Sequence, residues 1–204
     1  MKRARFSPIK SLFLLTTKYN YGRKPGRDQF IKIAESFGTP VYVYHAEKIK
    51  RQYERLKNAF TPGKVRIFYA SKALTNLKVL QYIKSLGSNV DCSSIFEAKL
   101  AKLAGFEPSQ ILYMSNGIHF DEIVEAQQMG IHINIDSLSN LEKFAKKFGG
   151  TYPIGIRLRP NIMAGGNLKI STGHEKSKFG ISVGQIEEIK ELVNKYDLNV
   201  QTLH

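Results

Sequence analysis

A lysine, an aspartate and an arginine each follow a short apolar run, and together they could perform chemistry on a carbonyl compound. Lys72 ends the segment 66–72, Asp91 ends 88–91, and Arg157 lies near the end of the run 154–158. A lysine at the end of a buried strand is costly to keep charged, and its uncharged amine is a nucleophile that forms Schiff bases. The alternative is that Lys72 extends its charged amine into the solvent and has no chemical role.

The elements that would position these residues form a regular repeat. Apolar, β-rich runs predict strands at 41–44, 65–70, 89–92, 111–114, 131–135, 154–158 and 199–203. Segments with helical periodicity predict helices at 46–60, 74–86, 95–104, 121–129, 138–148 and 185–196. The centres of five consecutive strands, from Phe68 to Ile156, recur every 20–23 residues. Repeated strand-helix units build a parallel sheet, and the strands are mostly apolar on both faces, as expected when helices cover the sheet.

Equal spacing, with no glycine-rich phosphate-binding turn after the first strand, favours a closed (β/α)8 barrel of the α/β class over an open doubly wound sheet. Without 41–44, about six of the eight strands of a barrel are found, and the sixth ends close to His204. An open barrel would expose unpaired strand edges. We therefore expect an incomplete barrel that is part of a longer protein, rather than a sheet closed by a partner. Functional side chains of such barrels gather at the carboxyl ends of the strands, where Lys72, Asp91 and Arg157 fall.

Five segments resemble, in the same order, the motifs of one group of pyridoxal phosphate enzymes. Tyr69-Ala-Ser-Lys72-Ala-Leu-Thr-Asn76 is similar to the signature Tyr-Ala-x-Lys-Ala-x-x-Asn of the alanine racemase-like barrel fold. The other four segments are the opening strand 38–44, the segment 89–94, Arg157-Leu-Arg-Pro-Asn161, and the loop 171–180, which ends in Ser-Lys-Phe-Gly. Within that fold the combination resembles the diaminopimelate decarboxylase family, from about Gly38 to His204.

The resemblance implies pyridoxal 5'-phosphate as the cofactor and a role for each matching residue. Lys72 would be the catalytic residue and hold the cofactor covalently, Asp91 would lie near both, and Arg157 would orient the bound cofactor. Ala70 and His204 would also lie at the cofactor site, and His174 would contact the substrate carboxylate from a loop. Simpler readings stay open. Arg157 could be a buried barrel arginine paired with an acid, His174 an exposed loop residue, and His204 only a neighbour of the residue that stacks on the cofactor.

The chain departs from the family's pattern at His45, where an acid is usual, and at Arg159, where asparagine is usual. The family's glycine-rich phosphate loop and C-terminal β-domain have no counterpart in these 204 residues, so we expect the chain alone to be inactive. Three parts are predicted: a basic, disordered extension at 1–24, an opening segment at 25–46 that contains the first strand, and a partial cofactor-binding barrel at 47–204.

The function that the resemblance implies is decarboxylation of meso-2,6-diaminopimelate to L-lysine and carbon dioxide, the last step of lysine biosynthesis, by a lyase that forms a homodimer at full length. A decarboxylase of ornithine, arginine or a carboxy-polyamine, or a racemase of the same fold, remains an alternative. A second alternative, from another class, is a binding or regulatory relative that has lost catalysis and the cofactor.

The charge distribution, the length of the apolar runs and the cysteine count argue against several other classes of protein. The net charge is +14, but nine basic residues and one acid fall within residues 1–32, so the excess lies mainly in the extension and not on a folded face that could bind nucleic acid. No apolar run approaches the roughly 20 residues that span a bilayer. The single cysteine, Cys92, excludes an intramolecular disulfide and a cysteine-rich zinc site, and we interpret it as a small core residue. We expect no metal site and a reducing, cytoplasmic setting.

Overall fold

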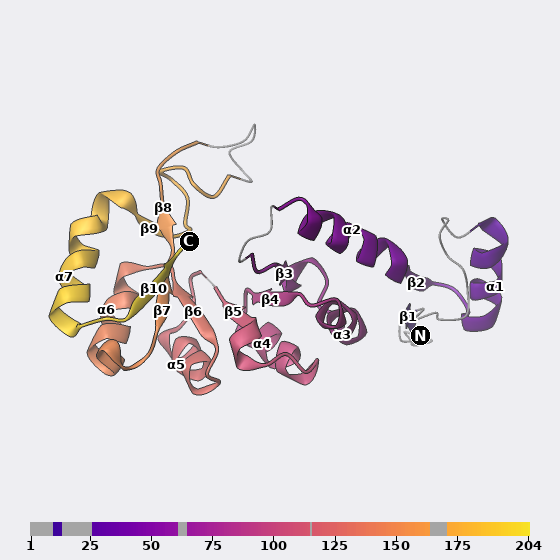
Figure 1. Ribbon diagram of the computed structural model, residues 1–204, viewed down its shortest axis with the longest axis horizontal. Coiled ribbons are helices and arrows are strands. Elements are labelled where there is room, and N and C mark those ends of the chain that lie inside the picture. Colours follow the sequence, from indigo (N-terminus) through magenta and orange to yellow (C-terminus); the bar gives the residue numbers. More distant parts are fainter. Residues whose placement is uncertain (1–9, 14–25, 61–64, 115, 164–170) are drawn as a thin grey trace, which may run out of the picture. The chain divides into compact units, whose positions relative to one another are not determined.

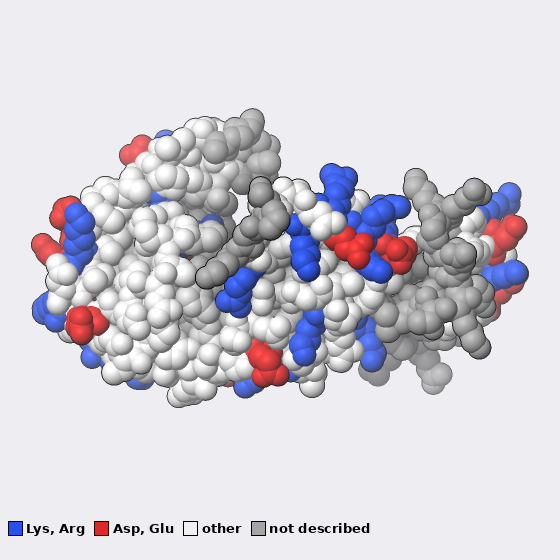
Figure 2. All heavy atoms as spheres, viewed as in Figure 1, with Lys and Arg blue, Asp and Glu red and all other residues white. Residues whose placement is uncertain are grey.

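A computed structural model describes residues 10–13, 26–60, 65–114, 116–163 and 171–204 (Figure 1). The chain divides into two compact units, Met1–Val65 and Arg66–His204. Among the described residues, none of the helices combines the length and the apolar character that crossing a membrane requires. On the face shown in Figure 2, basic and acidic side chains are interspersed over α2 and over α7, the helices Ala46–Asn58 and Ile186–Tyr196.

The described residues of the first unit form two parallel strands and two helices. Strand β1 (Lys10–Phe13) pairs in parallel with β2 (Val41–Tyr44), and helix α1 (Arg27–Phe37) lies between them in the sequence. Helix α2 begins after His45, whose Nδ1 accepts a hydrogen bond from the Lys48 N–H at 3.1 Å. The residue that departs from the family's pattern therefore caps a helix, since a side-chain acceptor at this position satisfies a free backbone donor.

The predicted basic extension, residues 1–24, is described only at residues 10–13, and these form strand β1 where the sequence predicts a disordered segment. The rest of the extension lies outside the described residues, so the prediction for it stays a prediction. The division after Val65 groups α2 with the first unit, whereas the sequence analysis assigns most of that helix to the barrel segment 47–204. Helix α1 was not predicted.

The second unit is built on a six-stranded parallel sheet. Its strands, in sheet order, are β3 (Phe68–Ala70), β4 (Asn89–Cys92), β5 (Ile111–Tyr113), β6 (His132–Ile135), β7 (Ile154–Ile156) and β10 (Val200–Leu203). The sheet order follows the chain order, as in a barrel that is wound in one direction. The connecting helices are α3 (Leu77–Ser85), α4 (Ile95–Leu103), α5 (Phe120–Gln128), α6 (Leu138–Phe148) and α7. This arrangement confirms the predicted partial barrel of the α/β class.

The second unit also contains short elements, and most of them are not predicted by the sequence pattern. Strand β8 (Leu158–Arg159) pairs in parallel with β9 (Ile181–Ser182), and each is too short to show a strand period. The described part of this unit also has four single-turn 3-10 helices: η1 (Ser71–Ala73), η2 (Pro108–Gln110), η3 (Gly149–Thr151) and η4 (Val183–Gln185). The first of them carries Lys72.

Side-chain caps determine where several helices start. The Asn76 side chain accepts hydrogen bonds from the Lys78 and Val79 N–H groups at the start of α3. Ser94 accepts from the Glu97 N–H at the start of α4, and Ser137 accepts from the backbone at the start of α6. Each cap lies just beyond a strand or turn at the carboxyl edge of the sheet, so the strand ends and the helix starts are defined together.

The two faces of the sheet differ in polarity. Side chains on one face pack against the helices and are almost completely buried: Val90, Cys92, Ile111, Tyr113, Ile133, Ile135, Ile154 and Ile156. Helices α4, α5 and α6 lie together along this side (Figure 1). Because successive side chains alternate between faces, the pairing register gives the opposite face Asp91, Asn134 and Thr202. The prediction of strands mostly apolar on both faces therefore holds for the helix side, whereas the opposite face mixes these polar side chains with apolar ones such as Leu112, the register partner of Asp91.

Candidate active site

Four of the residues singled out from the sequence lie at the carboxyl edge of the sheet. Lys72 lies in η1, directly after β3, and Asp91 lies in β4, where Ala70 is its register partner. Arg157 follows β7, and His204 follows β10. Since the carboxyl ends of parallel strands meet at one edge, the fold gathers residues that are up to 132 positions apart.

The charges at this edge are close enough to influence one another. Burial raises the pKa of Asp91, while the positive charges of Lys72 and Arg157 oppose that rise. Burial lowers the pKa of Arg157, and the negative charges of Asp136 and Asp91 oppose this change. Burial also lowers the pKa of His204, and Arg157 adds to that effect. One electrostatic cluster therefore contains Lys72, Asp91, Arg157 and His204.

Asp91 has an unusual environment for an acid. The side chain is half-buried, and its Oδ1 atom is shielded from solvent without accepting a hydrogen bond from any described residue. A buried carboxylate oxygen normally has a hydrogen-bond donor, because leaving it without one costs free energy. The orphaned oxygen therefore marks a position where a ligand with a hydrogen-bond donor or a positive charge would be stabilised.

Lys72 differs from its predicted environment. The sequence predicts its amine at a buried strand end, but in the structure Lys72 lies in the turn after the strand and its side chain is exposed. The expected desolvation of the amine is therefore not found. The positive charge of Lys72 does lower the pKa of Asp91, so the two groups lie near each other, while their shared role at one site stays a prediction.

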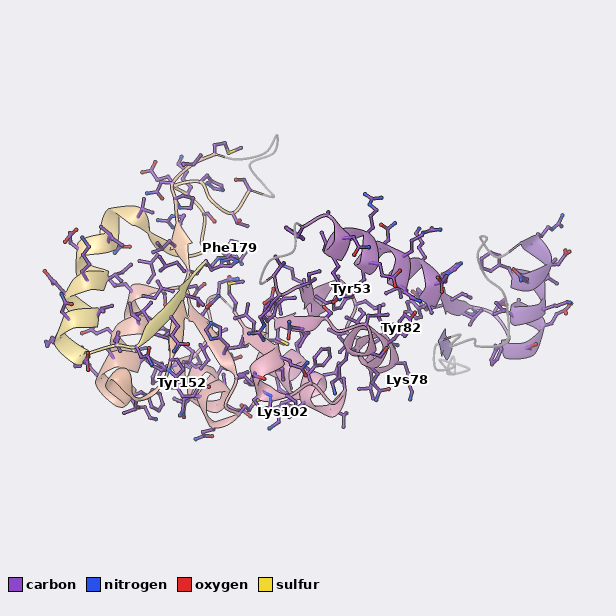
Figure 3. All side chains as sticks on the ribbon, viewed as in Figure 1. Tyr53, Lys78, Tyr82, Lys102, Tyr152 and Phe179 are labelled. Atoms are coloured by element: carbon purple, nitrogen blue, oxygen red, sulfur yellow. The ribbon has the colours of Figure 1, made fainter. Side chains whose placement is uncertain are left out.

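Arg157 contacts the loop that leads into β9. Its guanidinium carbon lies 4.7 Å from the centre of the Phe179 ring, which is a cation–π distance. The Ile181 N–H donates to the Arg157 carbonyl at 2.8 Å, so the backbone also ties the two segments together. Figure 3 shows Phe179 at the carboxyl-end side of the sheet and Tyr152 at the opposite side.

The structure adds an acid that the sequence analysis missed. Asp136 follows β6 at the same edge, is 6% exposed, and has a pKa raised by burial to about 6, although the Arg157 charge opposes the rise. A signal was present in the sequence, because Asn134-Ile-Asp136 at the end of β6 has the same pattern as Asn89-Val-Asp91 in β4. The acid beside Arg157 also keeps open the alternative reading of a barrel arginine paired with a carboxylate.

The remaining predicted residues have less direct contact with this cluster. His174 is half-buried in the segment 171–180, where its carbonyl accepts a hydrogen bond from the Ser177 N–H at 2.9 Å. Cys92 is fully buried, and burial raises the pKa of its thiol to about 12. This confirms that Cys92 is a core residue. The roles of Ala70, His174 and His204 at a cofactor site stay predictions.

Comparison with protein families finds a match over most of the chain. Residues 46–204 match the family described as "Pyridoxal-dependent decarboxylase, pyridoxal binding domain". Among curated proteins, the diaminopimelate decarboxylase of Methanothermobacter thermautotrophicus is 36% identical over 161 residues, which are 78% of this chain and 38% of that protein. The diaminopimelate decarboxylase of Campylobacter jejuni is 37% identical over 156 residues, 74% of this chain and 39% of that protein.

Solved structures show the same relationship. The diaminopimelate decarboxylase of M. jannaschii in complex with L-lysine matches with a TM-score of 0.74 and 34% identity, over 86% of this chain and 43% of that one. The Helicobacter pylori enzyme complexed with L-lysine matches with a TM-score of 0.76 and 32% identity, over 86% and 46%. A lysine/ornithine decarboxylase of Vibrio vulnificus, 24% identical over 86% and 44%, shares the fold with a TM-score of 0.70. The chain thus spans about two fifths of the length of the curated relatives that it matches.

Proposed function

The chain belongs to the pyridoxal-dependent decarboxylase family through its pyridoxal binding domain, and on that premise we propose that the protein converts meso-2,6-diaminopimelate to L-lysine and carbon dioxide. The observation that carries the proposal is the convergence of Lys72, Asp91 and Arg157 at one edge of the sheet. Identities of 36% and 37% to proteins named diaminopimelate decarboxylase support this substrate over others. Because the chain spans about two fifths of those proteins, the proposal concerns the protein at its natural length.

The described residues fit pyridoxal 5'-phosphate. Lys72 offers an exposed amine, Asp91 offers a carboxylate oxygen with no donor, and Arg157 supplies a cation beside them. When bound, the cofactor supplies an aldehyde that condenses with amines and a conjugated ring that takes up the electron pair left by a departing carboxylate. Lys72 would hold the group through Nζ, and Asp91 and Arg157 would position it.

Each residue then has a definable task. Lys72 would hold the cofactor covalently through Nζ, and for this its amine must be able to lose and regain a proton. Asp91 places its carboxyl group near Lys72, whose positive charge favours the ionised form of Asp91. Arg157 would offer hydrogen-bond donors to the cofactor from a guanidinium that lies against the Phe179 ring. The homodimer implied by the resemblance belongs to this proposal as well.

The activity is tested by incubating the protein at its natural length with meso-2,6-diaminopimelate and the cofactor, and by measuring L-lysine and carbon dioxide. We expect both products in equal amounts, and neither from the Lys72→Ala variant. Reduction with borohydride and digestion should place the cofactor on the peptide that contains Lys72. A label on another lysine would contradict the assignment of the site, and the absence of lysine formation would contradict the substrate.

The fold alone does not select the substrate, because a lysine/ornithine decarboxylase shares it. Ornithine, arginine and a carboxy-polyamine are therefore assayed under the same conditions, and racemisation of alanine is measured in parallel. Faster turnover of any of these compounds would replace diaminopimelate as the substrate. A protein that neither turns over any of them nor retains borohydride-trapped cofactor would instead be a binding relative without catalysis.

A further inference from the structure

The turn that carries Lys72 is anchored by a carboxylate outside the cluster described above. Ser71 is the first residue of η1 and is completely buried. Its hydroxyl lies 2.6 Å from Oε2 of Glu97, which belongs to the first turn of α4. The same hydroxyl lies 2.9 Å from the carbonyl oxygen of Asp91. One buried serine therefore joins the turn of Lys72, the strand of Asp91 and the start of the next helix.

Glu97 is itself held in place by the backbone. Its Oε2 atom also accepts a hydrogen bond from the Ser93 N–H at 2.8 Å, and the Glu97 N–H donates to the Ser94 hydroxyl at 3.2 Å. A glutamate three residues after a capping serine usually accepts from the N–H of that serine. Here the Glu97 carboxylate accepts from the N–H of Ser93, the residue before the cap, and from the Ser71 hydroxyl in η1. It therefore connects the start of α4 to the turn that carries Lys72.

We propose that Glu97 is a positioning residue for Lys72: through Ser71 it fixes the backbone turn from which the lysine extends. The proposal rests on the proposed function, because it assumes that Lys72 holds the cofactor. A side chain as long as lysine can reach many points, so an immobile backbone at the preceding residue restricts the region that Nζ samples. A buried, charge-assisted hydrogen bond of 2.6 Å provides such a restraint.

The charge of Glu97 has a second effect in the same place. It raises the pKa of Asp91, together with burial, against the lowering effects of Lys72 and Arg157. The carboxylate thus acts on both partners of the site, on Lys72 through the backbone and on Asp91 through its charge. Neither effect requires Glu97 to contact the cofactor or the substrate.

The test compares variants by cofactor attachment, which does not depend on turnover. The protein at its natural length is incubated with pyridoxal 5'-phosphate and reduced with borohydride, and peptide mass spectrometry gives the labelled fraction of Lys72 relative to the other lysines. We expect Glu97→Ala to lower this fraction by about tenfold or more, the size of effect that hydrogen bonds to charged groups support. Glu97→Gln, which can still accept from both donors, should retain most of the labelling.

Two control variants separate positioning from general destabilisation. Ser94→Ala removes the cap of α4 but leaves the contact between Glu97 and Ser71, so it should lower the thermal midpoint while Lys72 is labelled as in the wild type. Glu125→Gln removes an exposed acid that pairs with Lys99 and should change neither measurement.

The possible outcomes separate a failure of the role proposed for Glu97 from a failure of the proposed function. Wild-type labelling in Glu97→Ala, or equal loss in Ser94→Ala, would overturn the role of Glu97 while leaving Lys72 as the attachment site. Labelling of the wild type at another lysine would overturn the proposed site itself. Should Glu97→Ala not fold, Ser71→Ala removes the other partner of the bond, and undiminished labelling at Lys72 in that variant would refute the inference.

Discussion

Replacement of Gly155 by alanine should destabilise the fold from within the polar face of the sheet. Gly155 is the register partner of Asn134 in β6 and of Thr202 in β10. A Cβ atom added at Gly155 would overlap with Oδ1 of Asn134 and with Oγ1 of Thr202, and Asn134 is only 6% exposed. Both flanking side chains would have to move, Asn134 at a buried position and Thr202 at an exposed one.

The magnitude follows from two contributions. Overpacking of a buried site costs about 1–3 kcal/mol. The Thr202 hydroxyl donates to Asn134 Oδ1 at 3.3 Å, and separating this pair removes about 1 kcal/mol more. We therefore expect Gly155→Ala to lower the free energy of unfolding by about 2–4 kcal/mol. Arg157 lies two residues further along the chain, so the displacement would begin directly beneath the candidate site.

Urea unfolding of the protein at its natural length measures this change. Gly184→Ala is the matched control, because a Cβ there meets only the Ser182 hydroxyl at an ordinary 3.4 Å. In a Gly155→Ala background, Asn134→Ala should cost less than it does alone, since it removes one of the two overlapping groups. A Gly155→Ala variant within about 0.5 kcal/mol of the wild type would refute the reasoning, because such a value is typical of surface substitutions.

Three further predictions concern the site and the buried core. Because burial raises the pKa of Asp136 to about 6 from 3.8, the folded chain keeps a proton that the unfolded chain releases, and stability should fall as the pH rises between those values. Asp136→Asn should abolish that fall and raise the free energy of unfolding at pH 7 by about 1–3 kcal/mol in urea titrations; an unchanged pH profile would contradict this. The thiol of Cys92, buried and with a pKa raised to about 12, should react with a thiol reagent only after unfolding, and rapid labelling of the folded protein would exclude the core position. Phe179→Leu should cost about 0.5–2 kcal/mol through loss of the ring face beside Arg157, whereas Phe179→Tyr should retain it; equal losses in the two variants would argue against the cation–π contact.

The repeat of strands and helices could be predicted because it depends on local signals. The strand at residues 89–92 and the helix at 138–148 have the predicted bounds, and both combine apolar periodicity with a clear start and end. Strands β8 and β9 could not be predicted in this way, because two residues carry no period and only their mutual pairing defines them. Helix α1 lies before the first strand-helix repeat, in the part of the chain where basic residues are concentrated, so the repeat does not predict it.

The candidate site was predictable only in part. Lys72, Asp91 and Arg157 could be selected because they lie at strand ends within motifs of a known family. Asp136 was missed, although it repeats the pattern around Asp91, because no such motif contains it. The contact between Ser71 and Glu97 had no signal, since the two residues are 26 positions apart and meet only when α4 folds beside η1.

The sequence by itself determined the order of the elements, the parallel sheet and the lysine on which the proposed chemistry depends, because these follow from short-range periodicity and from residues that lie next to one another in the chain. The tertiary structure decided which face of the sheet carries the polar side chains, which acid accompanies Arg157, and that Lys72 is exposed on a turn held by Ser71. Such features depend on strand register and on contacts between distant segments, and these exist only after the chain has folded.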